Sequence, residues 1–169
     1  MRKVLLVIVL LITTIALTGC ITFTESFQAY EDVEQISSIE VYYFDKQYSP
    51  EWEEMDPSIQ PIKIIEQDSY LQVINDLEQL TFDDVVPLFM PTDPSFEVYR
   101  FVIKINFKSG VYQLVSNFGA VYTLDASGCC LDRFHGRVDD EVWNGLITKY
   151  IGEDLFNQYN QDQTKFHRC

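Results

Sequence analysis

Three cysteines and both histidines lie in the C-terminal third of the chain, where their types allow thiol or metal chemistry. A disulfide between the neighbours Cys129 and Cys130 would close a strained ring of a kind that usually marks redox function. Cys169 could instead pair with either of them, or all three thiols could stay free. His135 and His167 with two thiolates would complete a zinc ligand set, but the spacing lacks the paired pattern of structural zinc sites. We therefore expect no metal and no cofactor.

Two runs of carboxylates are the other groups with catalytic potential. Asp83-Asp84 and Asp139-Asp140-Glu141 could act as acid and base or bind calcium. Adjacent residues of a strand point to opposite faces, and carboxylates that open a helix cap its free N–H groups, so we expect turn and cap roles. The sequence also has no Gly-x-Ser-x-Gly, no calcium loop of alternating acids and no phosphate-binding glycine loop. We expect a protein that is not an enzyme.

Aromatic residues form a third candidate site, in and after the first expected strand. Tyr42, Phe44, Tyr48 and Trp52 lie on or near one face of that strand. If helices cover only the other face, these rings would be exposed and could stack on a sugar or pack on a protein partner. The alternative, which we favour, is a second small core beneath the loop of residues 46–60.

The N-terminus has the layout of a secretory signal peptide. Met1-Arg2-Lys3 is positively charged, and the uncharged run from Val4 to Leu17 is interrupted only by Thr13 and Thr14. Spanning a bilayer takes about 20 consecutive apolar residues, so this run is too short to remain as a membrane helix. The sequence therefore predicts a leader over residues 1–19 that is removed.

The leader ends in Leu17-Thr18-Gly19-Cys20, which resembles the lipobox of bacterial lipoproteins. In that family the cysteine thiol receives a diacylglyceryl group and the leader is cut just before it, which implies cleavage here between Gly19 and Cys20. Two fatty acyl chains such as palmitate hold a protein firmly on a membrane. The resemblance implies a protein anchored through Cys20 on the extracytoplasmic face of the cell membrane.

Length and charge limit the classes of partner. Cleavage leaves residues 20–169, the size of one domain, which can bury an independent core without disulfides. The leader carries two basic and no acidic residues, so the net charge changes from −14 to −16. Such a chain repels nucleic acid and anionic headgroups, so we expect no nucleic-acid partner. The membrane, through the lipid, and an unknown protein or cell-envelope ligand remain as partners.

Hydrophobic periodicity predicts an α+β domain, an antiparallel sheet of about five to six strands with two helices packed on one face. Residues 20–35 are expected to be a tether, 36–152 the globular domain and 153–169 a polar C-terminal tail. Asp68 is expected to cap the first helix, and Asp139 or Asp140 the second. The expected elements are strands over 36–45, 62–66 and 80–86, a helix over 69–79, a three-stranded meander over 96–125, a loop over 126–138 and a helix from 139 or 140 to 151.

The meander is predicted from residues 99–107, which alternate apolar and polar. A two-residue turn at Ser109-Gly110 would place Phe107 opposite Tyr112 and Ile105 opposite Leu114. A three-residue turn at 117–119 would then place Leu114 beside Tyr122 and Tyr112 beside Leu124.

Three segments are similar to small, uncharacterised lipoproteins of Gram-positive bacteria. They are Ser38–Asp45, Phe101–Gly110 and Asp139–Ile151, and the resemblance spans most of residues 38–151. These are core patterns, so only the lipobox implies a role, and it falls on Cys20. We expect a membrane-anchored, non-enzymatic binding or interaction domain. The alternatives are a cell-envelope thiol-redox protein or enzyme using Cys129 and Cys130, and a subunit of a membrane complex.

Overall fold

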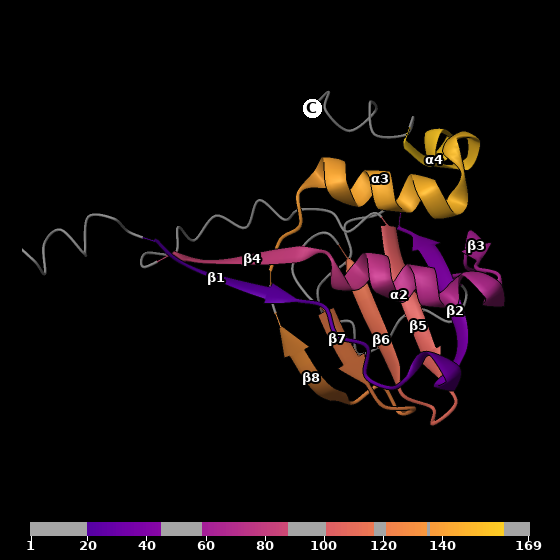
Figure 1. Cartoon of the computed structure of the whole chain (residues 1–169), viewed down its shortest axis with the longest axis horizontal. Coiled ribbons are helices and arrows are strands. Elements are labelled where there is room, and N and C mark those ends of the chain that lie inside the picture. Colours follow the sequence, from indigo (N-terminus) through magenta and orange to yellow (C-terminus); the bar gives the residue numbers. More distant parts are fainter. Residues whose placement is uncertain (1–19, 45–58, 88–100, 117–120, 135, 161–169) are drawn as a thin grey trace, which may run out of the picture.

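The computed structural model describes residues 20–44, 59–87, 101–116, 121–134 and 136–160 (Figure 1). Within these ranges the chain forms a six-stranded antiparallel sheet, a separate two-stranded ribbon and three α-helices, which confirms the α+β fold class. The elements are β1 (Cys20–Ser26), β2 (Ile36–Tyr43), β3 (Lys63–Ile64), α2 (Tyr70–Glu78), β4 (Thr81–Pro87), β5 (Phe101–Phe107), β6 (Tyr112–Ser116), β7 (Val121–Leu124), β8 (Cys130–Phe134), α3 (Asp140–Ile151) and α4 (Glu153–Asn160).

The six-stranded sheet has the order β3-β2-β5-β6-β7-β8. Strands β5 to β8 follow one another along the chain, as short hairpins require. The predicted loop over residues 126–138 is wrong in part, because it contains β8. Four of the five β8 residues are exposed, so this strand has no apolar alternation that a sequence pattern would reveal.

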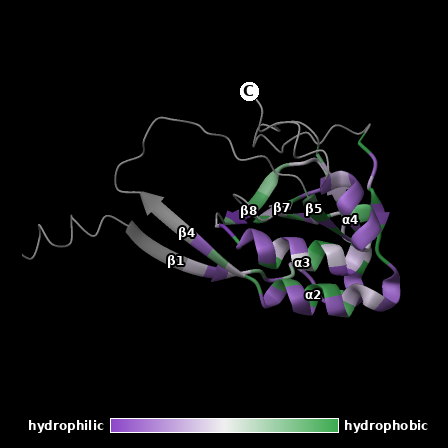
Figure 2. Cartoon of the chain, turned by 90° about the horizontal axis from the view of Figure 1, so that it is seen from above, coloured by the Kyte–Doolittle hydropathy of each residue, from purple (hydrophilic) through white to green (hydrophobic). Residues whose placement is uncertain are grey.

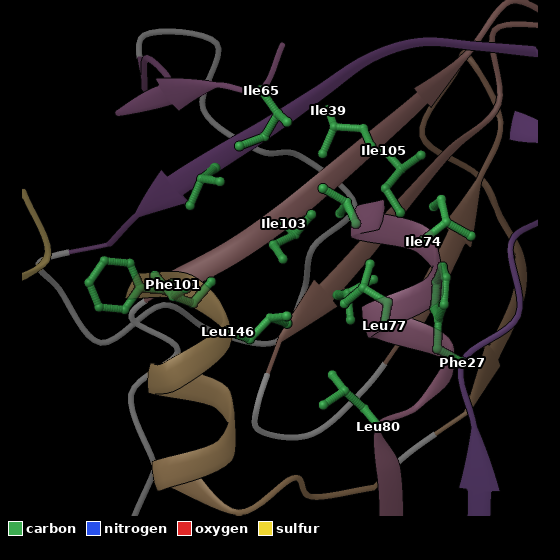
Figure 3. Close-up of a cluster of buried hydrophobic side chains, with 14 of the residues drawn as sticks. Phe27, Ile39, Ile65, Ile74, Leu77, Leu80, Phe101, Ile103, Ile105 and Leu146 are labelled. Carbon is green, nitrogen blue, oxygen red and sulfur yellow. The ribbon is translucent and has the colours of Figure 1, made fainter. Parts of the chain in front are cut away.

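The helices pack on one face of the sheet and bury their apolar stripes in a single core (Figures 1 and 2). Ile39 and Val41 of β2 pair with Ile105 and Ile103 of β5, and all four are buried in this core. Figure 3 shows Ile74 and Leu77 of α2 and Leu146 of α3 in the same cluster. Each buried aliphatic side chain of this kind contributes about 1.5–3 kcal/mol.

The register of β5 with β6 differs from the prediction by one residue. Ile105 lies opposite Gln113, not Leu114, because the turn has three residues, Lys108 to Gly110. Gly110 has a φ of 92°, in the left-handed region that favours glycine in such turns. The predicted pairs Leu114–Tyr122 and Tyr112–Leu124 between β6 and β7 are confirmed. The turn over 117–120 lies outside the described residues.

The shifted register divides β6 between two cores. Val115 faces the helices, whereas Leu114 packs on the opposite face of the sheet with Val102. The opposite face thus carries a second, smaller buried cluster. Its members are Tyr42, Phe44, Val102, Leu114, Tyr122 and Leu124, with Ile59 and Tyr112 packed against them.

Helix ends agree in part with the predicted caps. Asp139 caps α3, its Oδ1 accepting hydrogen bonds from the N–H groups of Glu141 and Val142. Asp68 caps no helix, because a 3₁₀ turn over Gln67–Ser69 precedes α2 and contains it. The predicted tail over 153–169 is wrong in part, because residues 153–160 form α4. Residues 161–169 lie outside the described residues.

A carboxylate joins α2 to α3 at the surface of the helical layer. Asp76 of α2 accepts hydrogen bonds from Lys149 and Tyr150 of α3, and from Gln72 one turn earlier. Burial opposes ionisation of Asp76, but these hydrogen bonds and the charge of Lys149 outweigh it and hold the pKa of Asp76 below its ordinary value of 3.8. The ionised carboxylate therefore stabilises the packing of the two helices.

Replacing the cap of α3 tests its contribution to stability. Asp139→Ala leaves two helix N–H groups without their acceptor, and we expect a loss of about 1 kcal/mol in the free energy of unfolding. Asp139→Asn keeps a capping oxygen and should lose only a few tenths of that amount. Urea denaturation measures both, and equal losses in the two variants would contradict the cap.

Replacing Asp76 tests the helix contact through its pH dependence. A lowered folded pKa means that ionised Asp76 adds stability above pH 3.8, and that this stability is lost as the pH falls through the folded pKa. Asp76→Asn should therefore be less stable by about 1 kcal/mol at pH 7. The difference from wild type should shrink in acid, as followed by urea denaturation. A difference that stays constant down to pH 2, or an equal effect of Asp154→Asn on α4, would contradict this role.

Candidate functional site

The residues that follow the predicted cleavage point form a β-strand, and the predicted tether is wrong. β1 pairs antiparallel with β4 from Ser26–Thr81 at the domain to Cys20–Pro87, the last pair that the structure describes. The resulting ribbon projects from one side of the domain in Figure 1. Seven residues per strand at about 3.4 Å each place the outer end about 20 Å from the inner end. The candidate anchoring site at Cys20 is therefore carried on a structured arm.

Strand β4 is fixed at its inner end by the chain after β8. Phe82 is fully buried and packs edge-on against Phe134, with ring centroids 5.2 Å apart. Asp83 and Arg137 exchange two backbone hydrogen bonds of 3.0 Å. A Cβ on Gly136 would lie only 2.7 Å from the Phe82 Cβ, so glycine is required for this close approach. The ribbon thus has a rigid base.

Strand β1 is fixed through the residues that follow it. Phe27 is 1% exposed and lies in the main core (Figure 3). Gln113 of β6, 3% exposed, donates from Nε2 to the Gln28 carbonyl (3.1 Å) and the Thr123 hydroxyl (3.2 Å). Its Oε1 accepts from the Tyr30 N–H (3.0 Å). We call Gln113 with these partners the Gln113 latch, because it binds the chain after β1 to the sheet.

Further contacts hold the remainder of residues 27–35 on the domain. The N–H of Lys108 donates to the Gln35 carbonyl at 2.8 Å, and its ammonium donates to the Glu34 carbonyl at 2.6 Å. The Tyr30 ring lies 6.2 Å from that of Phe107. None of these interactions was predicted, because each joins the segment to residues far along the chain.

A cavity of about 350 Å³ lies between the end of β1 and the outer strands of the sheet. Glu25 and Asp132 are among the residues that line it, as are Gln113 and Thr123. Both carboxylates belong to exposed residues. Its full lining is Glu25, Ser26, Gln28, Gln113, Val121, Thr123, Asp132, Arg133 and Phe134.

The neighbouring thiols lie where β7 turns into β8. Cys129 and Cys130 are both exposed and form no disulfide. The Asp125 carboxylate organises the turn by accepting from the Ser127 hydroxyl (2.6 Å), the Ser127 N–H (2.8 Å) and the Cys129 N–H (3.0 Å). These hydrogen bonds hold the pKa of Asp125 below its usual range. Cys169 lies outside the described residues, so its pairing stays a prediction.

The second small core that we favoured for the aromatic residues is confirmed for Tyr42 and Phe44, and the alternative of an exposed binding surface is wrong for these two. Tyr42 and Phe44 are 5% and 3% exposed and belong to the second buried cluster, where their rings stack 6.5 Å apart. The Tyr42 hydroxyl donates to Glu40 at 2.6 Å, and burial together with this carboxylate raises the pKa of Tyr42. Tyr48 and Trp52 lie outside the described residues.

The remaining candidate groups do not meet in one site. In the described ranges no three His, Cys, Asp or Glu side chains are close enough to hold a metal ion. The Asp83 carboxylate accepts from the Thr24 hydroxyl across the ribbon at 3.1 Å, which is a structural role. His135 and His167 lie outside the described residues.

Comparison with protein families, curated proteins and solved structures finds no match to this chain. Among the helices that the structure describes, none is long and apolar enough to cross a membrane.

Removing the Gln113 side chain tests the latch. Gln113→Ala leaves the Gln28 carbonyl and the Tyr30 N–H without their partner. We therefore expect the free energy of unfolding to fall by about 2 kcal/mol. Amide hydrogen exchange of residues 27–30 should quicken more than that of α3. Gln79→Ala, at an exposed glutamine, should change stability by less than about 0.5 kcal/mol. Equal exchange rates in wild type and Gln113→Ala would rule the latch out.

Proposed function

We propose that this chain is a bacterial lipoprotein, anchored by a diacylglyceryl group on Cys20, whose domain acts outside the cytoplasm as a binding or interaction module. The observation that carries the proposal is the position of β1. All seven pairs from Cys20–Pro87 to Ser26–Thr81 lie on the mature side of the predicted cut between Gly19 and Cys20. Cleavage and lipidation at Cys20 would therefore keep every strand pair that the structure describes in this ribbon.

The domain part of the proposal is supported by the distribution of polar groups. Of the candidate carboxylates, Asp139 caps a helix and Asp83 accepts a hydrogen bond across the ribbon. Seven of the nine residues that line the cavity beside the ribbon are polar or charged, and the net charge of −16 after cleavage favours cationic ligands. A protein partner or a cell-envelope ligand fits this surface, whereas nucleic acid does not.

The anchor is tested by labelling with a palmitate analogue in a bacterium that expresses the full chain. We expect label on the wild-type protein and its recovery with membranes, because the Cys20 thiol carries the lipid. Cys20→Ala should lose both the label and the membrane association. Cys129→Ala should keep both, since its thiol is not the acceptor. Label retained on Cys20→Ala would contradict the proposal.

A second candidate function follows from the exposed thiols. The thiolate of Cys129 or Cys130 could attack a substrate disulfide and release one substrate thiolate, and the neighbouring thiolate could then displace the second and close a disulfide. This role predicts that Cys129→Ser and Cys130→Ser keep the melting temperature but lose disulfide exchange. Our leading proposal predicts no loss of function in either variant. Unchanged exchange would reject the redox role.

A further inference from the structure

The cavity beside the end of β1 has a polar floor that crosses three strands of the sheet. Gln113 of β6 pairs with Thr123 of β7, and Thr123 pairs with Asp132 of β8. The 3.2 Å hydrogen bond from Gln113 to the Thr123 hydroxyl shows that these two side chains lie on one face. Asp132 lies directly opposite Thr123, so its side chain is on that face too. We call these three residues the polar row.

The next row on the same face is apolar and belongs to the main core. Val115, Val121 and Phe134 lie two residues from the members of the polar row, and side chains two apart on a strand share a face. The two valines are buried in the core, and Phe134 packs against it. The core therefore ends where the polar row begins, and the cavity lies over that boundary.

Thr123 has a hydrogen-bond donor that the fold does not use. Its side chain is only 4% exposed, and its oxygen accepts a hydrogen bond from Gln113. Within the described residues, the Thr123 hydroxyl donates its own hydrogen to no acceptor. Buried polar groups in native proteins normally use their hydrogen-bonding capacity. Because Thr123 lines the cavity, an oxygen of a bound molecule would supply the missing acceptor.

The charged side chains that line the cavity are acidic. Glu25 lines it from β1 and Asp132 from β8, and neither forms an ion pair with a described residue. One oxygen of Asp132 accepts from the Arg133 N–H at 2.9 Å. Arg133 also lines the cavity, but it lies opposite Tyr122 of the second buried cluster, so strand alternation directs its side chain to the other face. Its charge therefore does not neutralise the two carboxylates.

The size and chemistry of the cavity define a class of ligand. Its volume of about 350 Å³ is at the small end of the range for small-molecule sites. Two carboxylates favour a cation, and an ammonium group has three N–H donors to share between them and the Gln113 oxygen. The unused Thr123 donor requires an oxygen on the same ligand.

We propose that this cavity binds a small primary amine that also carries a hydroxyl or carbonyl oxygen. The ammonium group lies between Glu25 and Asp132, and the oxygen accepts from Thr123. The inference deepens the proposed binding role and rests on it, but it does not depend on the lipid.

The test uses the full-length chain, purified from membranes in detergent, and titrations followed by saturation-transfer NMR. The probes are ethanolamine and glucosamine, with glucose as the analogue of glucosamine that lacks the amine. We expect saturable binding of at least one amine and none of glucose. Glu25→Gln and Asp132→Asn should each weaken binding about tenfold, because each removes a charge-assisted hydrogen bond.

The matched control is Glu153→Gln, which removes an exposed carboxylate on α4 and should leave the affinity unchanged within about twofold. Failure of both amines to bind would overturn the proposal. Equal affinities in wild type, Glu25→Gln and Asp132→Asn would overturn it as well. Calcium that binds through Glu25 and Asp132 while both amines do not would show that the site takes a metal ion instead.

The contribution of Thr123 is tested with propylamine, in which a methyl group replaces the hydroxyl of ethanolamine. Wild type should prefer ethanolamine, and Thr123→Val should lose this preference. Equal loss of affinity for both probes in Thr123→Val would show a purely structural role and overturn the contact.

Palmitate labelling of the same preparation separates this site from the anchor. Missing label on Cys20 would overturn the anchor alone. Normal labelling without amine binding would overturn the amine site alone.

Discussion

The antiparallel pairing of β1 with β4 is the interaction on which the position of Cys20 depends. Neither strand belongs to the six-stranded sheet, yet both are fixed at their inner ends. Phe82 is buried at the base of β4, and Phe27 is buried directly after β1. A flexible tether would separate the proposed anchor from the domain, whereas this ribbon would couple the two mechanically.

This coupling gives the proposed function a physical basis. An acidic domain held only by acyl chains would be free to tumble above the headgroups. A ribbon fixed by the Gln113 latch and by the Asp83–Arg137 backbone pair restricts that motion. The polar cavity next to the base of β1 and the exposed thiols at the start of β8 would then face the cell envelope at a defined height. Interaction with a partner at the cell surface would benefit from such positioning.

Local patterns predicted the parts of the fold that depend on local chemistry. The alternation in β5 and the cap at Asp139 could both be predicted from the sequence, because each depends on residues that are neighbours in the chain. The β5–β6 register was wrong because a turn of two or three residues cannot be distinguished until the left-handed Gly110 is placed. β1 was missed because its partner strand begins 55 residues beyond its end and its own sequence lacks a sustained apolar period. Gln113 was missed because a buried glutamine is visible only when its backbone partners are known.

The most direct test of the central claim is the distance between the ribbon and the helical layer in the acylated protein. Spin labels on Thr22→Cys and Glu141→Cys, with Cys129, Cys130 and Cys169 replaced by serine, report this distance by pulsed electron paramagnetic resonance on vesicles. A structured ribbon predicts one narrow distance distribution, which Gln113→Ala should broaden. A broad distribution in the protein with an intact latch would show that Cys20 is joined to the domain by a flexible chain, and would contradict the account.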